Sequence, residues 1–209
     1  MILHGYFRST ASWRVRIALG LKGIAVEQRS YKLLHGDQRA PDYLRLNPQG
    51  FVPALELDDG RIITQSLAII EYLDETAPEP PLLPGDAFGR AKVRSLAQLI
   101  ACDIHPVQNL SVIRRVAELA GEGEDRKWAA QTIREGLDAF EARIAAEKGP
   151  FCVGDRVTLA DVLLVPQLGN ARRFGLEVNW PRICEVEAAC MAIDAFAQAV
   201  PDKQPDAAG

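Results

Sequence analysis

The chain has few residues that could build disulfides or metal sites. Its 209 residues include four cysteines and three histidines, and no two cysteines form a CxxC pair. The histidines also lack metal-ligand spacing, both among themselves and with the cysteines. Scattered thiols of this kind are typical of reduced proteins of the cytosol. We therefore expect no structural zinc, no catalytic metal and a cytoplasmic location.

Long apolar runs and an excess of basic residues are missing as well. The longest apolar stretches, such as Val162 to Pro166, are far shorter than the roughly 20 residues of a membrane-spanning helix. No apolar leader occupies Met1 to Thr10, so we expect no signal peptide. The net charge of −4 gives the protein no overall attraction for nucleic acid or for an anionic membrane.

The residues that are present predict two domains. Hydrophobic residues make up 48% of the chain and charged residues 25%, which is ordinary for a globular protein with a real core. Residues 1–77 alternate strand and helix patterns in the order βαβ, then ββα, with Asp59-Gly60 as a hairpin turn. Four prolines between Pro78 and Pro84 favour a stiff linker over 78–88. Residues 89–209 show only helical patterns.

Periodicity and turn residues give approximate bounds for these elements. The strands are expected at 2–6, 25–31, 54–58 and 61–64, and the helices of the first domain at 12–22 and 66–75. In the second domain the patterns predict helices at 86–116, 125–147, 158–174 and 181–200, followed by a frayed polar tail over 201–209.

The start of the first helix lacks the acidic residue that usually completes it. Ser9 or Thr10 is a natural N-cap, but no Asp or Glu lies in the first turn, and Arg8 and Arg14 flank it. Cations at a helix N-terminus oppose the helix dipole, which suits a site where an anion binds. A plain cap with solvated arginines explains the same residues.

Two further positions have open backbone groups. Gln65-Ser66 begins the second helix, and Ile69 stands where a capping acid is expected, so a carboxylate could bind there; a simple serine cap is the alternative. Val52-Pro53 lies just before a strand, where a cis bond would expose Val52 to an extended ligand; an edge-strand proline without a ligand is the alternative. In contrast, Thr158-x-x-Asp161 is a complete capping box, which indicates a structural role.

Several motifs together resemble those of the zeta-class glutathione transferases, over essentially the whole chain. The WRVRIAL block and DIHPVQNLSV are the more specific ones, whereas VP, QS and TLAD are typical of glutathione transferases in general. The matching segments are FRSTASWRVRIAL from Phe7, NPQGFVPALE from Asn47, QSLAIIEYLDE from Gln65, DIHPVQNLSV from Asp103, GDRVTLADVLLVPQ from Gly154, NARRF from Asn170 and QPD from Gln204.

The resemblance implies a thioredoxin-like α/β domain, an all-α domain and glutathione as co-substrate. Arg173 is implied to reach a substrate carboxylate with Arg8 as the other cation, although the neighbouring Arg172 is an alternative. Ser9 and Thr10 are implied to act at the glutathione sulfur. The residues implied to bind glutathione are Ser9, Thr10, Ala11, Gln38, Val52, Pro53, Gln65, Ser66, His105, Asn109 and Ser111.

The family also implies a reaction, which is the isomerisation of maleylacetoacetate to fumarylacetoacetate in aromatic amino acid degradation. A thiolate that adds to the maleyl double bond makes it temporarily single, so that it rotates before the thiolate leaves. Family members often have Ser-Ser-Cys where this chain has Ser9-Thr10-Ala11, which excludes a protein thiol as nucleophile here. Glutathione would supply that thiol. A homodimer is implied by resemblance alone.

Other functions remain open at this point. Maleylpyruvate isomerase uses the same chemistry on a shorter keto acid, and a general transferase or a dehalogenase of α-haloacids uses the same thiolate. An interaction module without turnover is also compatible with the missing cysteine. Three of these residues also have a purely structural interpretation. His105 would be an interdomain hydrogen-bonding residue, Arg173 would interact with a helix C-terminus, and Gln38 would be a solvated loop residue.

Overall fold

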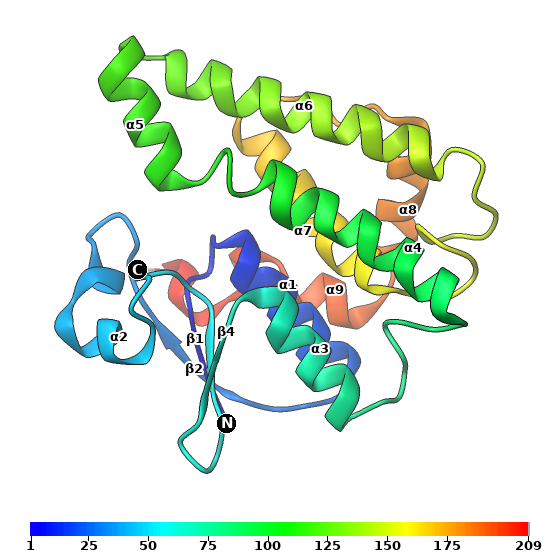
Figure 1. The fold of residues 1–209 in the computed structure, drawn as a ribbon, viewed down its shortest axis with the longest axis horizontal. Helices are drawn as coiled ribbons and strands as arrows, with labels where there is room; N and C mark the ends of the chain where they lie inside the picture. Colours follow the sequence, from blue (N-terminus) through cyan, green and yellow to red (C-terminus); the bar gives the residue numbers. More distant parts are fainter. Residues whose placement is uncertain (209) are drawn as a thin grey trace. The chain divides into compact units, whose positions relative to one another are not determined.

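The computed structural model describes residues 1–208 and contains two compact units (Figure 1). The first unit comprises residues 1–81 together with the chain from residue 192 onward, and the second comprises residues 82–191. Among the described helices, none combines the length and apolar character needed to cross a membrane.

A four-stranded sheet forms the centre of the first unit. Its strands run in the order β2-β1-β3-β4, with β1 and β2 parallel and the other neighbouring pairs antiparallel. The expected hairpin is confirmed: Gly60 adopts φ 82°, and its N–H donates to the Leu57 carbonyl at 3.0 Å. The bounds are β1 (Ile2–Gly5), β2 (Glu27–Ser30), β3 (Ala54–Glu56) and β4 (Ile62–Thr64).

Helices α1 (Thr10–Leu21) and α3 (Ser66–Thr76) lie to one side of these strands, and α2 (Pro41–Leu46) lies to the other (Figure 1). The apolar faces of β1, α1, β3 and α3 form the core, which includes the wholly buried side chains Leu3, Val15, Ile17, Leu55 and Ile70. The patterns in the sequence did not predict α2, because six residues are too few to show a helical period.

The end of the chain differs from the expected domain division. The predicted helix at 181–200 is two helices, α8 (Pro181–Met191) in the second unit and α9 (Asp194–Ala199) in the first. α9 packs closely against α1, since a Cβ added to Gly20 would lie 3.2 Å from the Ala195 Cβ. The following residues form two 3₁₀ turns, 201–203 and 205–208, so the prediction of a frayed tail was wrong over the described residues.

The second unit is all-helical within its described range. The predicted helix at 86–116 is interrupted: α4 is followed by the π-helix η2, and α5 begins only after Pro106, which has no N–H to continue the ladder. The bounds are α4 (Ala87–Gln98), η2 (Leu99–Ile104), α5 (Leu110–Ala120), α6 (Glu124–Ile144), α7 (Leu159–Arg173) and α8.

A close helix contact and a capping box are two well-defined features of this second unit. Gly136 of α6 allows η2 to approach, because a Cβ there would lie only 2.3 Å from Ile104 Cγ1. The predicted capping box of α7 is confirmed, and the wholly buried Asp161 accepts from the Thr158 N–H at 2.7 Å and its hydroxyl at 2.8 Å. Asp161 also accepts from the Cys152 N–H at 2.7 Å. The carboxylate in the first turn of α7 is therefore bonded entirely to donors of the fold.

Candidate active site

The start of α1 is the most distinctive polar feature of the first unit. Ser9 is the N-cap, and its Oγ accepts a hydrogen bond from the Ser12 N–H at 3.2 Å. A hydroxyl that already accepts in this way keeps its own proton available for a further acceptor. Helix geometry also leaves the N–H groups of Thr10 and Ala11 without an acceptor in the helix. Together these three donors make a small site for an anion.

Exposure differs among the residues at this helix start. Arg8 is exposed, with its guanidinium carbon 5.9 Å from the centre of the Phe7 ring, whereas Ser9 and Ala11 are half-buried and Thr10 is buried. The first turn contains no acid. Helices α4, α5 and α8 also lack a first-turn acid. The missing acid alone therefore does not indicate a binding site, and it is the geometry of Ser9 that does.

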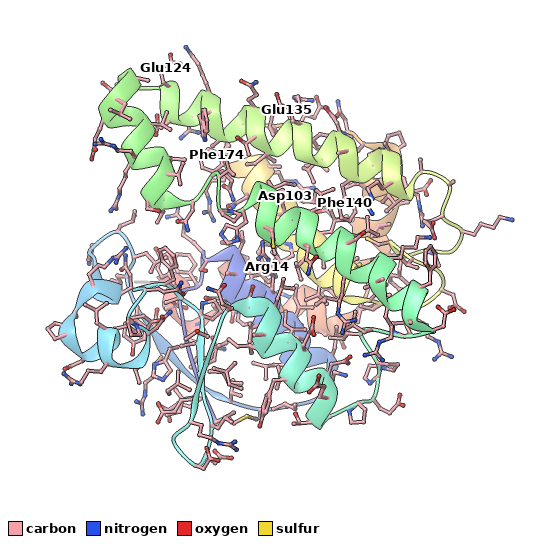
Figure 2. All side chains as sticks on the ribbon, viewed as in Figure 1. Arg14, Asp103, Glu124, Glu135, Phe140 and Phe174 are labelled. Atoms are coloured by element: carbon pink, nitrogen blue, oxygen red, sulfur yellow. The ribbon has the colours of Figure 1, made fainter. Side chains whose placement is uncertain are left out.

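The start of α3 is the second open helix end of this unit. Gln65, at the cap position, has φ 70°, a left-handed conformation that non-glycine residues rarely adopt, and its side chain makes no capping bond. Backbone strain of this kind is often retained where it serves a site. Arg14 of α1, labelled in Figure 2, is buried and donates from Nη1 to Ser66 Oγ at 3.4 Å. The Ser66 proton therefore remains available for an acceptor outside the helix.

A loop between α2 and β3 presents Val52. The Val52–Pro53 bond is cis, and pairing of β3 begins only at Ala54, so Val52 lies just outside the sheet. Two buried side chains hold the preceding carbonyl: Tyr43 Oη lies 2.5 Å and Asn47 Nδ2 2.8 Å from the Phe51 oxygen. Sequence analysis did not identify this pair as site residues, because no local pattern shows which carbonyl a side chain four or eight residues away will bond.

Hydrogen bonds join this loop to its neighbours. Asn47 Oδ1 accepts from the Gln49 N–H at 3.1 Å, and Gln65 Nε2 donates to Gln49 Oε1 at 3.0 Å. Gln38 lies in a short 3₁₀ turn, 37–39; its Nε2 donates to the Leu33 carbonyl at 3.4 Å, and its inaccessible Oε1 has no partner among the described residues. Gln49 thus links the start of α3 to the loop that carries Val52.

The remaining predicted residues belong to the second unit. His105 follows η2 and is half-buried, Asn109 is the N-cap position of α5, and Ser111 is exposed in its first turn. Between them, the buried Gln108 accepts from Asn170 Nδ2 of α7 at 3.2 Å. This bond ties the segment that carries His105 and Asn109 to the helix that ends at Arg173.

The two arginines at the end of α7 have different surroundings. Arg172 forms a bidentate ion pair with Glu187, with both N–O distances 2.6 Å, and this pair raises the pKa of Arg172. Arg173 is exposed, and its carbonyl accepts from Arg126 Nη2 at 3.2 Å. Glu187 thus occupies the guanidinium fork of Arg172.

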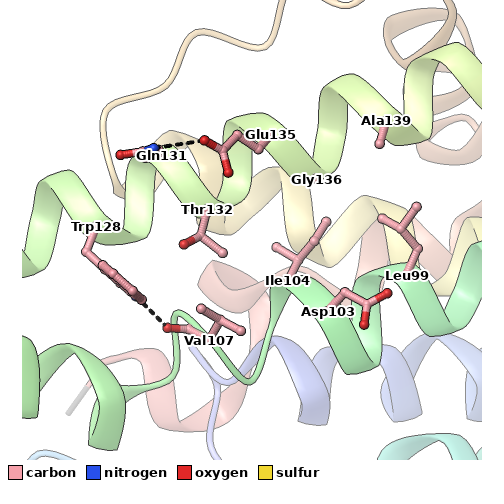
Figure 3. A pocket seen from close by; sticks show the side chains of 10 residues that line it. All are labelled: Leu99, Asp103, Ile104, Val107, Trp128, Gln131, Thr132, Glu135, Gly136 and Ala139. Atoms are coloured by element: carbon pink, nitrogen blue, oxygen red, sulfur yellow. Dashed lines mark hydrogen bonds between the residues drawn. The ribbon is translucent and has the colours of Figure 1, made fainter.

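A separate cavity of about 570 Å³ lies in the second unit, between η2 and α6 (Figure 3). Trp128 Nε1 donates to the Val107 carbonyl at 3.0 Å, and Gln131 Nε2 donates to Glu135 at 2.8 Å. None of the predicted site residues lines it. No group of three His, Cys, Asp or Glu side chains suited to a metal ion occurs within residues 1–208.

Comparison with known proteins identifies the family. The family models for the N-terminal and C-terminal domains of glutathione S-transferase match residues 3–81 and 107–187. Maleylacetoacetate isomerase of Pseudomonas aeruginosa is 47% identical over 99% of this chain and 98% of its own length. The chain belongs to the zeta-class glutathione transferase family. Its α/β and all-α domains are therefore those of the glutathione transferase fold, as predicted.

Solved zeta-class relatives agree with this placement. The holo structure of a bacterial zeta-class maleyl pyruvate isomerase superimposes with a TM-score of 0.95 at 42% identity and covers 99% of both chains. A maleylacetoacetate isomerase from Anaeromyxobacter dehalogenans has a TM-score of 0.89 at 46% identity and covers 98% of this chain and 96% of its own. That structure holds dicarboxyethyl glutathione and citrate in its active site.

Proposed function

We propose that this chain is a glutathione-dependent cis–trans isomerase that converts maleylacetoacetate to fumarylacetoacetate. The observation that carries the proposal is the start of α1, where the Ser9 hydroxyl and the N–H groups of Thr10 and Ala11 converge without a competing acid. These donors suit a sulfur anion, because hydrogen bonds to a thiolate stabilise it and lower the thiol pKa.

Other residues of the first unit fit the rest of glutathione. Val52, outside the sheet, suits main-chain pairing with the cysteinyl part, and the family resemblance implies Gln38 for the same part of the peptide. Gln65 and Ser66 at the start of α3 suit the γ-glutamyl carboxylate. When bound, glutathione supplies a thiolate that adds reversibly to the maleyl double bond. Ser9 and Thr10 would hold that sulfur in its ionised form near neutral pH.

The substrate requires groups that bind carboxylates and stabilise charge on a ketone oxygen. The family resemblance implies Arg173 and Arg8 for the carboxylates, since the planar guanidinium matches them. Donors at the start of α1 would stabilise the developing negative charge in place of solvent. The resemblance implies His105 as a further residue for the substrate. The dicarboxyethyl group carried by glutathione in the Anaeromyxobacter relative supports a dicarboxylic substrate.

Maleylpyruvate isomerisation is the second candidate, because a solved maleyl pyruvate isomerase matches this fold with a TM-score of 0.95. The deciding assay compares kcat/KM for maleylacetoacetate and maleylpyruvate with and without glutathione. We expect turnover only with glutathione and a higher kcat/KM on maleylacetoacetate. A higher value on maleylpyruvate would support the second candidate, and conjugation of a generic electrophile without isomerisation would contradict both.

Arg173 and Arg172 provide a matched pair within this assay. Arg173→Gln should lower kcat/KM by about tenfold or more, because it removes one charged hydrogen-bonding partner of the substrate. Arg172→Gln should leave kcat/KM near the wild-type value, because Arg172 bonds Glu187. Equal losses in the two variants would contradict the assignment of Arg173.

The proposal extends to a cytoplasmic homodimer that acts in tyrosine and phenylalanine degradation, as the family resemblance implies. Sedimentation of the purified protein tests the oligomeric state, and a monomer at micromolar concentration would remove that part alone.

A further inference from the structure

The end of the chain contacts the segment that leads into the start of α1. Asp206, in the 3₁₀ turn 205–208, accepts a hydrogen bond from the Phe7 N–H at 2.9 Å. The hydroxyl of Ser30, the last residue of β2, also donates to the Asp206 carboxylate. A residue near the end of the sequence therefore bonds the main chain two positions before Ser9.

The same segment is held from its carbonyl side by Arg16. This buried guanidinium donates from Nη2 to the Phe7 carbonyl at 2.9 Å and from Nη1 to the Tyr6 carbonyl at 3.5 Å. Its Nε and Nη2 donate to the Ala199 carbonyl, at the end of α9, at 3.2 and 3.1 Å. Both backbone groups of Phe7 are thus bonded to fixed partners.

Charge supports this arrangement. Burial lowers the pKa of Arg16 to about 10, and the nearby Asp206 carboxylate acts in the opposite direction. Arg16 therefore remains charged near neutral pH, and the tail supplies a negative charge beside it. The Ser9 N–H donates back to the Tyr6 carbonyl at 3.0 Å, so the position of residues 6 and 7 is transmitted directly to the cap residue.

We propose that Asp206 is a positioning residue for the catalytic loop: by fixing the Phe7 N–H, it sets the orientation of Arg8 and Ser9 toward the glutathione sulfur. This inference rests on the proposed function of the α1 start. Asp206 does not contact the reacting atoms in this account. It acts through Phe7 and Ser9, and small displacements of aligned groups are sufficient to slow catalysis strongly.

The test is the Asp206→Ala variant of the full chain, with Asp202→Ala as control because Asp202 is exposed in the same tail. Ultraviolet titration of the bound glutathione thiol and isomerase kinetics are measured on both. Asp206→Ala should raise the pKa of the bound thiol and lower kcat by about tenfold, as expected for a misaligned catalytic group. Asp206→Asn should recover at least about half of the lost kcat, because its amide oxygen still accepts from Phe7.

These measurements separate positioning from simple structural support. A lower melting temperature with unchanged thiol pKa and kcat would overturn the inference, and so would a loss of kcat in Asp202→Ala equal to that in Asp206→Ala. A wild-type protein that neither binds glutathione nor isomerises either keto acid would remove the proposed function, and the inference with it.

If Asp206→Ala does not fold, the exchange rate of the Phe7 amide hydrogen is measured in the wild-type protein instead. The Phe7 amide should exchange as slowly as amides of β1, because it is bonded to Asp206. Exchange of that amide at the rate of an exposed loop would contradict the inference.

Discussion

The helices α1 and α7 both begin with a hydroxyl residue as the N-cap, but only α7 has a carboxylate in its first turn. At α7, Thr158 is paired with Asp161, which is wholly buried and accepts three hydrogen bonds from the surrounding chain. At α1, the Ser9 hydroxyl accepts from the Ser12 N–H, and no acid lies in the first turn. One helix end supplies its own anion, and the other has donors left for an anion from outside.

This difference distinguishes a helix start that is closed within the fold from one that is open to a ligand. At α7 the buried carboxylate accepts from the N–H and the hydroxyl of the cap residue Thr158 and contributes to stability. Donors without such a partner contribute less to stability but remain available to a ligand. Substitutions at the closed end should therefore change mainly stability, and substitutions at the open end should change mainly activity.

The largest expected effect is at the closed end. Asp161→Ala should lower the free energy of unfolding by about 3 kcal/mol, because three donors lose their acceptor in a buried site. Chemical denaturation measures the loss, and Asp155→Ala, an exposed aspartate nearby, is the control. A change below about 1 kcal/mol would show that the closed box is not the main stabilising feature of this turn.

Ser9→Ala tests the open end. We expect kcat/KM to fall at least about tenfold, which corresponds to about 1.4 kcal/mol, because the sulfur loses its hydroxyl donor. The helix itself should lose about 1 kcal/mol with its cap. Thr158→Ala is the matched control: it should reduce stability while kcat/KM stays near the wild-type value. If both variants lost activity equally, the contrast between the two ends would be wrong.

Ala11→Asp would make the start of α1 resemble that of α7. A carboxylate in this half-buried first-turn position should stabilise the helix by about 0.5 kcal/mol through the helix dipole. It should also weaken glutathione binding by about fivefold, because it repels the thiolate. Calorimetric titration measures the affinity, and Ala11→Asn separates charge from size. Unchanged affinity in Ala11→Asp would place the sulfur elsewhere.

The smallest effect concerns pH. Burial raises the pKa of Asp161 above its usual 3.8, and hydrogen bonds from Cys152 and Thr158 partly oppose that shift. The folded state therefore holds this proton more tightly than the unfolded state, so the stabilisation is full at low pH and declines as pH rises through the folded pKa. The destabilisation by Asp161→Ala should be larger in acid than at neutral pH. Denaturation at both pH values checks the sign.

Sequence patterns were sufficient for features that are local. The Asp59-Gly60 hairpin and the Thr158-Asp161 box are confirmed, because a turn or a cap depends on residues within a few positions of one another. The motifs of the zeta class predicted the family and the glutathione transferase fold, and both are shown. The roles of Gln38, His105 and Arg173 in binding stay predictions.

Features that depend on distant contacts were missed or wrong. The tail from residue 201 was expected to fray, yet Asp206 bonds Phe7 across 199 positions of the sequence. Tyr43 and Asn47 were not identified as site residues either, although both donate to the Phe51 carbonyl, eight and four positions further along the chain. The sequence also showed no sign of the ion pair that Arg172 forms with Glu187, fifteen positions further along the chain.

By itself the sequence determined the family, the alternation of strands and helices, and which helix starts carry an acid, because these depend on residue order and short-range hydrogen bonding. Tertiary structure decided that distant residues hydrogen-bond the segment before α1, that Arg172 pairs with Glu187, and to which unit the last helix belongs. The physical reason is that such partners are chosen by packing of remote segments, as with Gly20 against Ala195, and remote packing has no local pattern.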